Sequence, residues 1–437
     1  MPSVNDIMEM AELLRSRSVV AVEDHCVAVR NRNAKCRKCV DVCMAGAIEV
    51  ALNKLTVDAG ACVGCGACVA ACPTEALVSL DPMQEDLAVA ISAAIKQAGG
   101  MAVFACARIA ARQVGDPEKY ATVPCLGRID EETLVAIASH GVDDITLVDG
   151  TCSTCKYHAV SPCVDTAVET AIALLEAMGS DAMIMRSSAF PPEVEARDER
   201  SVMGASRRRF FSSAGGYARN VAMTAAEKAV ADALHQNQQK KLLTLRERLG
   251  AGKSGKLPTF EAERNMRLLD DMSRIGEETG ALAALLEEAE AVRDAEGAAN
   301  APAVADGADA SAANGEVAAN GGAVAPATID TRLFGSLSID ASSCSGCGMC
   351  VMFCPTEALK YSTLEEPENE EARYLEFQAA DCTQCRMCVD VCLRRCVELS
   401  SEVSVAELFD FEPRLIEIPK PPKAASILAR RHGREKK

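Results

Sequence analysis

Between residues 82 and 186 the apolar positions follow a helical period in some segments and form short continuous runs in others. The helical spacing occurs at residues 87–97, 131–139 and 164–178. The short apolar runs occur at residues 101–106, 144–148 and 182–185. Strands that alternate with helices in this way are typical of a parallel sheet covered by helices. We therefore expect a small central α/β domain with a parallel sheet.

The remaining apolar pattern predicts separate elements on either side of this domain. Residues 3–16 carry apolar side chains along one side behind Ser3, which indicates a short amphipathic helix, and residues 18–22 are a β-branched strand candidate. Two segments rich in Ala, Leu, Glu, Lys and Gln, at 220–248 and 260–293, are separated by a Gly-rich break. This pattern predicts a helical hairpin, which we interpret as a spacer or a partner-binding arm.

Residues 298–328 are dominated by Ala, Gly, Asn, Asp and Pro, the composition of a disordered linker. A flexible chain of this length spans roughly 30 Å. We expect it to tether the last part of the protein rather than fix its position.

Composition narrows the class of protein. The chain has 437 residues, 22 of them cysteine, with no tryptophan and only 3% aromatic residues. Two to four domains are the expectation for this length. Cysteines bunched three residues apart favour metal binding over a disulfide framework, and no signal-peptide pattern or long apolar run occurs, so we expect a cytoplasmic protein without a membrane span. The net charge of −17 argues against nucleic acid and suits docking on a basic patch of a redox partner, although it also suits solubility alone.

One cysteine motif occurs twice, and the two copies have nearly the same sequence. Its first copy is Cys62-Val-Gly-Cys65-Gly-Ala-Cys68, with Cys72-Pro73 after three more residues. Its second copy is Cys344-Ser-Gly-Cys347-Gly-Met-Cys350, with Cys354-Pro355 at the same distance. Both continue with Thr-Glu-Ala-Leu. Three cysteines at this spacing can surround one iron-sulfur cube, and the fourth usually reaches a neighbouring cube, so two copies of one module are expected.

Each copy has a companion motif. The first follows residue 25 with a stretched first gap and has the cysteines Cys26, Cys36, Cys39 and Cys43. The second has Cys382, Cys385, Cys388 and Cys392. Residues 18–80 resemble the two-cluster bacterial ferredoxins, and the same pattern returns at 337–400. The resemblance implies crossed ligation, in which each cube takes three cysteines from one motif and one from the other.

Applied to this sequence, the resemblance implies four ligand sets. These are Cys26, Cys36, Cys39 and Cys72 for cluster 1; Cys43, Cys62, Cys65 and Cys68 for cluster 2; Cys344, Cys347, Cys350 and Cys392 for cluster 3; and Cys354, Cys382, Cys385 and Cys388 for cluster 4. A pair of zinc sites in the first module is the alternative. Cys396 is left over and is interpreted as a small buried hydrophobe, with a ligand role as the alternative.

Three phrases in the central domain resemble the delta subunit of methyl-viologen-reducing hydrogenases. They are Phe104-Ala-Cys106, Pro124-Cys125-Leu-Gly-Arg128-Ile-Asp130, and the stretch from Gly141 through Cys152-Ser-Thr-Cys155 to Tyr157. The resemblance implies a [2Fe-2S] cluster that passes electrons between a hydrogenase or formate dehydrogenase and a heterodisulfide-reductase complex. Its expected ligands are Cys106, Cys125, Cys152 and Cys155, with Cys163 as the substitute.

The central domain departs from that family at two positions. Ala107 follows Cys106 where a second cysteine is expected nearby, and Lys156 stands where a histidine precedes Tyr157. Buried or incidental thiols therefore remain an alternative to a cluster. The pair Cys152-x2-Cys155 is also compatible with a thiol-disulfide redox site.

An arginine-rich phrase, Ser-Arg-Arg-Arg-Phe-Phe at residues 206–211, resembles a twin-arginine export signal. Such signals lie near the amino terminus and precede an apolar stretch, neither of which applies here. We interpret the phrase as a solvated basic turn, with docking of an acidic partner as the alternative.

Together these patterns predict an α+β protein of several domains. The expected parts are an N-terminal 2[4Fe-4S] ferredoxin module at 1–81, the hydrogenase-delta-like α/β domain at 82–186, a basic turn and helical hairpin at 187–297, a disordered linker at 298–328, a C-terminal 2[4Fe-4S] ferredoxin module at 329–412 and a basic tail at 413–437.

The favoured function is that of an iron-sulfur electron-transfer subunit with four [4Fe-4S] clusters and one further [2Fe-2S] cluster in the central domain. Electrons would enter one ferredoxin module and leave by the other through the central domain. No nucleophile with a base and no nucleotide loop is recognised, so we expect no catalytic residues and a role beside a hydrogenase, formate dehydrogenase or heterodisulfide-reductase-like enzyme. A thiol-disulfide oxidoreductase and a redox-sensing scaffold are the alternatives.

Overall fold

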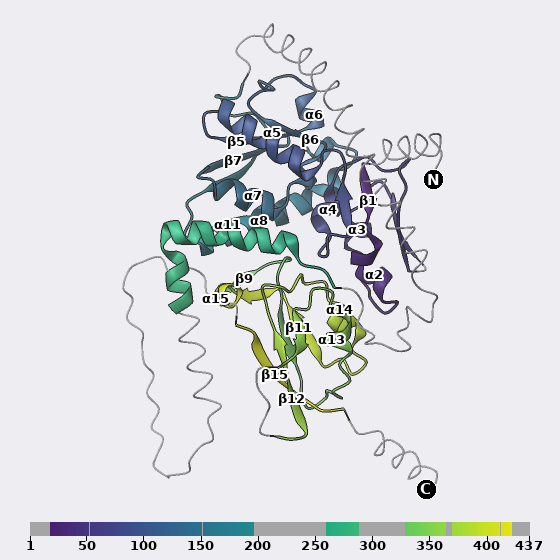
Figure 1. Ribbon diagram of the computed structural model, residues 1–437. Coiled ribbons are helices and arrows are strands. Elements are labelled where there is room, and N and C mark those ends of the chain that lie inside the picture. The colour runs from purple at the N-terminus through teal and green to yellow at the C-terminus, as the bar shows by residue number, and fades with distance from the viewer. Residues whose placement is uncertain are drawn as a thin grey trace, which may run out of the picture.

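The computed structural model describes residues 18–51, 53–150, 152–195, 259–287, 328–363, 369–410 and 412–421. The central domain, the helix α11 and the C-terminal module lie one below another, with the N-terminal module beside the central domain (Figure 1). The predicted amphipathic helix, the arginine-rich phrase, the first hairpin helix and nearly all of the linker fall outside the described residues. No helix in the described ranges is long and apolar enough to cross a membrane.

The central domain contains the predicted parallel sheet. Its strand order is β6-β5-β7-β8, all parallel, with the strands β5 (Ala102–Cys106), β6 (Ala121–Val123), β7 (Asp144–Val148) and β8 (Met183–Ser187). The helices are α5 (Gln84–Gln97), α6 (Ala107–Ala110), α7 (Glu131–Ala138) and α8 (Ser161–Ala177). Both faces of the sheet are buried, since Phe104 and Leu147 pack in one apolar core and Val103 and Val148 in another. Because side chains on both faces of the sheet are buried, successive residues of the interior strand β5 are all apolar. This explains why the strand lacks the alternating pattern of apolar and polar residues.

The six elements expected in this domain are all present, within a few residues of their expected ends. Strand β6 was not anticipated, because Ala121–Val123 is only three residues long and offers too short a run to recognise. Helix α7 begins at Asp130, whose side chain accepts a hydrogen bond from the Thr133 backbone N–H at 3.1 Å, and this N-cap fixes where the helix starts.

The N-terminal module is built from two short antiparallel strand pairs and small helices. Strand β1 (Val19–Ala21) pairs with β4 (Leu77–Ser79), and β2 (Ile48–Ala51) pairs with β3 (Lys54–Val57). The helices are α2 (Val27–Arg30), α3 (Lys38–Asp41) and α4 (Ala67–Ala71), after the one-turn helix η1 (Glu23–His25). Its core contains few large side chains and several cysteines.

The C-terminal module repeats this plan with additions. Strand β10 (Ser336–Ile339) pairs with β13 (Val397–Ser400), and the helices α13 (Met349–Phe353) and α14 (Met387–Val391) correspond to the small helices of the first module. The additions are a sheet of β11 (Leu359–Tyr361), β12 (Ala372–Phe377) and β15 (Arg414–Pro419), the pair β9 (Thr328–Asp330) and β14 (Glu402–Ser404), and α15 (Val405–Phe409). Because β15 pairs with β12 along its whole length, the module extends past the expected boundary at 412.

Helix α11 (Glu263–Thr279) lies between the central domain and the C-terminal module (Figure 1). Its buried side chains Leu268 and Met272 belong to the same apolar core as the central helices and the C-terminal module. It ends at Gly280, which has a left-handed φ of 81°. This half of the expected hairpin therefore packs against other parts of the protein along one face and is not a free arm.

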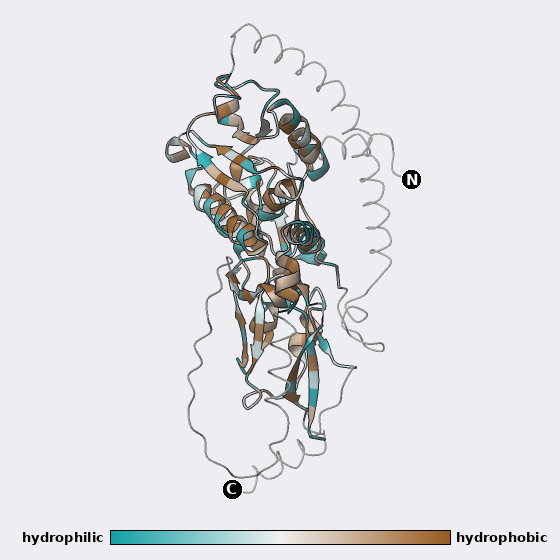
Figure 2. Ribbon diagram, turned by 90° about the vertical axis from the view of Figure 1, so that its left-hand side faces the viewer, coloured by the Kyte–Doolittle hydropathy of each residue, from teal (hydrophilic) through white to brown (hydrophobic). Residues whose placement is uncertain are grey.

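The C-terminal module is fixed and not merely tethered. Its residues share one apolar core with the central domain, and in Figure 2 hydrophobic stretches occur in the elements of both halves where these meet. Arg332 also donates to the buried carboxylate of Glu131 on α7, with 2.6 Å between Nε and Oε1. Linker composition could not reveal this, because the contacts are made by the modules at its two ends.

Candidate metal centres

The expected ligands of cluster 2 surround one cavity in the N-terminal module. We call this set cage 2 and number the other sets likewise. The lining cysteines of cage 2 are Cys43, Cys62, Cys65 and Cys68. The loop that delivers three of them turns at Gly64 and Gly66, with φ of 66° and 77°, and then enters α4. Cys43 comes from the other motif, so the structure brings together the crossed set.

Three of the four cysteines of cage 1 lie in the small core of the same module. Cys26, Cys39 and Cys72 are buried in it. Burial and the neighbouring thiols of Cys72, Cys36 and Cys26 raise the pKa of Cys39 to about 12. The pKa responds in this way because the four thiols of the expected set lie close together.

The C-terminal module brings together both of its expected sets. One cavity is lined by Cys344, Cys347, Cys350 and Cys392, which form cage 3, and by Cys396. A second cavity is lined by Cys354, Cys382, Cys385 and Cys388, which form cage 4. Each set again takes three thiols from one motif and one from the other.

Backbone N–H groups point at several of these sulfurs. The Ala47 N–H donates to Cys43 Sγ and the Ala76 N–H to Cys72 Sγ, each at 3.3 Å, and the Gly346 N–H donates to Cys344 Sγ at 3.4 Å. Such donors stabilise negative charge on sulfur and tune the potential of a cluster. The loops are thus arranged for thiolates.

Without a metal, four thiolates could not share such a cage. Burial comes first among the causes that raise the pKa of Cys350 to about 12, and the other cage 3 thiols add to it. A cation held among the sulfurs removes that penalty, since thiolates are the ligands of iron-sulfur clusters. Among the described residues no group of three or more His, Cys, Asp or Glu side chains could hold a single metal ion. Three of the four expected sets each surround a cavity, as a multi-atom cluster requires.

The expected central-domain ligands gather at one edge of the parallel sheet. Cys106 ends β5, Cys125 follows β6, and Cys152 and Cys155 follow β7, so all come from the carboxyl ends of strands. Burial raises the pKa of Cys125 to about 11, and the thiols of Cys152 and Cys106 are among the neighbours that raise it. We call these four residues the central group.

Cys163 lies apart from the central group. It lies on α8. Burial raises its pKa, and Arg332 is the charged neighbour that lowers it. The loops of the central group are linked instead by Arg108, which donates to Thr154 Oγ1 at 2.9 Å. The structure therefore favours the first choice of four residues over the substitute. None of the 22 cysteines forms a disulfide bond.

The central group adjoins cage 2, and cage 2 adjoins cage 1. Cys65 of cage 2 is among the thiols that raise the pKa of Cys125, after burial. Burial likewise raises the pKa of Cys68 in cage 2, and Cys39 of cage 1 contributes to that rise. The N-terminal module and the central domain meet tightly here, because a Cβ on Gly127 would lie 3.2 Å from the Cβ of Ala67.

Cage 1 adjoins cage 4 across the contact between the two modules, and cage 4 adjoins cage 3. Burial raises the pKa of Cys385 in cage 4 to about 12, and Cys36 of cage 1 adds to the rise. Both thiols pack against a small apolar group, which consists of Val27, Met387 and Val391. Burial also raises the pKa of Cys388, and Cys350 of cage 3 contributes. The five cysteine groups therefore form one row, with the central group at its end.

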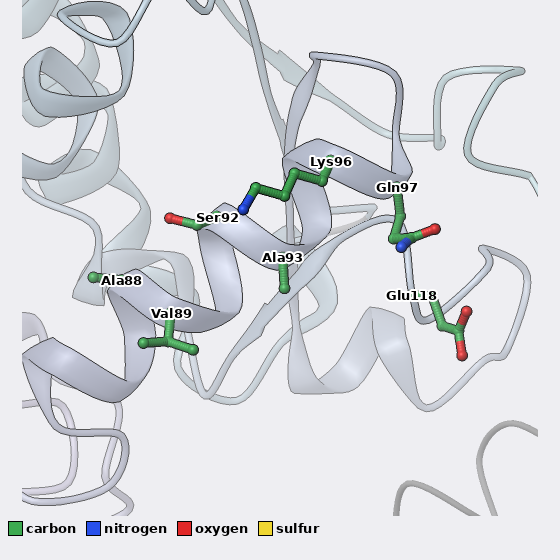
Figure 3. Close-up of a pocket in the computed structure, with 7 residues that line it drawn as sticks. All are labelled: Ala88, Val89, Ser92, Ala93, Lys96, Gln97 and Glu118. Atoms are coloured by element: carbon green, nitrogen blue, oxygen red, sulfur yellow. The ribbon is translucent and has the colours of Figure 1, made fainter.

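A further hollow lies along α5 (Figure 3). It is lined by Ala88, Val89, Ser92, Ala93, Lys96, Gln97 and Glu118. It contains no cysteine and no histidine, and the close-up places Lys96 and Glu118 at separate points of its rim. We assign no chemistry to it.

Comparison with known protein families identifies both modules. Residues 343–396 match the 4Fe-4S dicluster domain family, and residues 55–78 match the 4Fe-4S binding domain family. The first match spans cages 3 and 4, and the second spans the loop of cage 2 and Cys72. No curated protein and no solved structure matches the chain. Two ferredoxin-type 4Fe-4S domains are thus found in this protein, which supports [4Fe-4S] clusters and an iron-sulfur electron-transfer role.

Proposed function

We propose that the protein is an electron-transfer subunit with four [4Fe-4S] clusters, one in each of cages 1 to 4. When bound, the clusters supply one-electron exchange by iron. The chain supplies the thiolate ligands, the N–H donors to sulfur and a low exposure to water, which together set each potential. The main support for this assignment of ligands is that the crossed sets of cages 2, 3 and 4 each surround one cavity.

The order of the cages supports a linear relay. Neighbouring thiols connect the central group to cage 2, cage 2 to cage 1, cage 1 to cage 4 and cage 4 to cage 3. Electrons would pass directly between the two modules at the contact of cages 1 and 4. The route through the central domain that we expected from the sequence is replaced by one in which the central group is an end point.

The far end of the relay is at cage 3, where Cys347 is exposed to solvent. An exposed end suits exchange with a partner protein, because electrons reach only clusters that the partner can approach. The central group supports a [2Fe-2S] site at the other end. From its resemblance to the hydrogenase delta subunit we propose a hydrogenase, formate dehydrogenase or heterodisulfide-reductase-like partner in the cytoplasm.

The proposal is tested by counting iron and sulfide per chain after anaerobic purification. About sixteen irons are expected from the four cages, and about eighteen if the central group holds a [2Fe-2S] cluster. The double variant Cys106→Ala/Cys152→Ala should then lose about two irons, while the matched control Cys163→Ala keeps them all. A folded, colourless, iron-free protein would overturn the assignment.

A further inference from the structure

Cage 3 contains a fifth cysteine. Cys396 lines the same cavity as the four expected ligands, and only 5% of its surface is exposed. Its Sγ lies 3.4 Å from the Sγ of Cys392, the ligand that crosses over from the other motif. The sequence alone suggested a small buried hydrophobe, and the burial is as expected. The position of the sulfur inside the cage is the new observation.

The other three cages show what normally occupies this position. Each crossing cysteine is followed four residues later by a buried side chain at the same point of the turn. These residues are Ala47 after Cys43, Ala76 after Cys72, Ala358 after Cys354, and Cys396 after Cys392. Only cage 3 has a sulfur where the other cages have a methyl group.

The four turns share one backbone feature, which supports comparing their last residues. The residue just before this position has a left-handed φ in every turn. The values are 64° at Gly46, 51° at Glu75, 59° at Glu357 and 53° at Arg395. In two of the turns the alanine N–H donates to the sulfur of the crossing cysteine, at 3.3 Å. The turn thus brings the side chain of its last residue close to the crossing ligand.

We propose that Cys396 is a reserve ligand of cage 3, able to replace Cys392 as the fourth thiolate of the cluster. This inference rests on the proposed function, since it requires a cluster in cage 3. The exchange needs no oxidant or reductant. The Cys396 thiol gives its proton to solvent as its sulfur binds iron, and a displaced Cys392 takes up a proton.

Two matched substitutions test the proposal, with iron and sulfide per chain and paramagnetic resonance of the reduced clusters as readouts. Cys392→Ala leaves Cys396 in place, whereas Cys354→Ala at cage 4 leaves only Ala358. We expect the Cys392→Ala protein to keep its full iron content, and the Cys354→Ala protein to lose up to about four irons. The double variant Cys392→Ala/Cys396→Ala should lose as much as Cys354→Ala. Equal losses in both single variants would overturn the proposal.

A second test adds a cysteine to cage 4 and measures whether iron binding returns. Adding Ala358→Cys to the Cys354→Ala protein recreates the cage 3 arrangement in cage 4, and it should restore the lost iron. If Ala358→Cys does not restore the iron lost from cage 4, and Cys392→Ala also loses iron, then Cys396 contributes only to packing. A third variant separates this proposal from the proposed function. If Cys344→Ala/Cys347→Ala removes no iron, cage 3 holds no cluster. The proposed function would then fail at cage 3, whatever the role of Cys396.

Discussion

At the scale of single residues, the cluster-binding loops depend on backbone that turns left-handed. Gly346 and Gly348 adopt φ of 65° and 72°, as Gly64 and Gly66 do in the first module. The sequence indicates such a turn where it places a glycine, because glycine adopts positive φ without steric cost. It could not predict that Gln384 and Arg386 take the same conformation in cage 4, with φ of 49° and 62°, because those side chains rarely adopt it.

Replacing Gly346 by alanine should destabilise the C-terminal module more than the same change at Gly141. Both glycines have positive φ, so each substitution carries a backbone cost of about 1 kcal/mol. A Cβ on Gly346 would in addition lie 2.0 Å from the carbonyl oxygen of Pro419, while one on Gly141 meets nothing within 4 Å. Anaerobic denaturant titration measures the two unfolding free energies. Equal values would contradict the close contact with β15.

Glu376 provides an acid-sensitive contact in the sheet that extends the C-terminal module. Its carboxylate accepts from the Thr363 N–H at 3.0 Å and lies 3.3 Å from Lys360 Nζ. Burial acts to raise its pKa, but these hydrogen bonds and the lysine charge hold it below its ordinary value. The group therefore stabilises the fold above its unfolded pKa of about 4.3, and that stability is lost as the pH falls through the lower folded pKa.

We expect Glu376→Gln to lower the unfolding midpoint in urea at pH 7 and to reduce the further drop on acidification below about pH 4.3. Glu398→Gln, at an exposed position of β13, is the control and should leave both quantities nearly unchanged. An unaltered acid response in the Glu376 variant would mean that this carboxylate does not drive it.

At the scale of elements, α11 connects all three parts of the protein. Arg264 donates to the carbonyl oxygen of Cys72 at 2.9 Å, Asn265 Nδ2 donates to the carbonyl oxygen of Leu333 at 2.9 Å, and Arg267 pairs with Glu132 at 2.7 Å. Its helical period was readable from the sequence. Its position in the fold could not be predicted from the sequence, because an amphipathic pattern does not identify the surface that a helix covers.

The ion pair between Arg332 and Glu131 fixes the C-terminal module to α7. Glu131 is fully buried, so removing its partner leaves a carboxylate without compensation. We expect Arg332→Leu to cost about 3–5 kcal/mol, and the double variant Arg332→Leu/Glu131→Leu to cost less than the single one, because no buried charge then remains. Thermal unfolding under anaerobic conditions compares the two. A double variant that is less stable than the single one would show that the pair is not what the single substitution disrupts.

At the scale of the whole molecule, the row of cysteine groups decides which clusters are neighbours. The resemblance to two-cluster ferredoxins implied the crossed sets, and the structure brings the cysteines of each set together, since each set comes from two motifs close together in the chain. The contact of cage 1 with cage 4 joins residues about 350 positions apart, as in the hydrogen bond from the Lys35 N–H to Asp390 Oδ2 at 2.8 Å. No motif encodes that contact, because it depends on how complete modules pack.

The row predicts how reduced clusters influence one another magnetically. Cys385→Ala/Cys388→Ala should remove cluster 4, after which cluster 3 has no reduced neighbour and its paramagnetic resonance signal should narrow. The signals of clusters 1 and 2 should stay broad, because these two clusters remain neighbours and magnetic coupling falls steeply with distance.

The control for this prediction removes the end of the row instead. Cys344→Ala/Cys347→Ala should abolish cluster 3 and leave the interaction of clusters 1 and 4 unchanged. If the cluster 3 signal stayed broad without cluster 4, the cages would not be arranged in the proposed order.

The apolar contact of Val27 with Met387 and Val391 has a consequence for how the protein is made. Synthesis completes the wall of cage 1 long before the ribosome reaches residue 387. Until then the C-terminal module does not cover the side of cage 1 that faces Cys385. On the proposed function, a cluster is therefore inserted into cage 1 most easily during translation, while the second half of the chain is still missing.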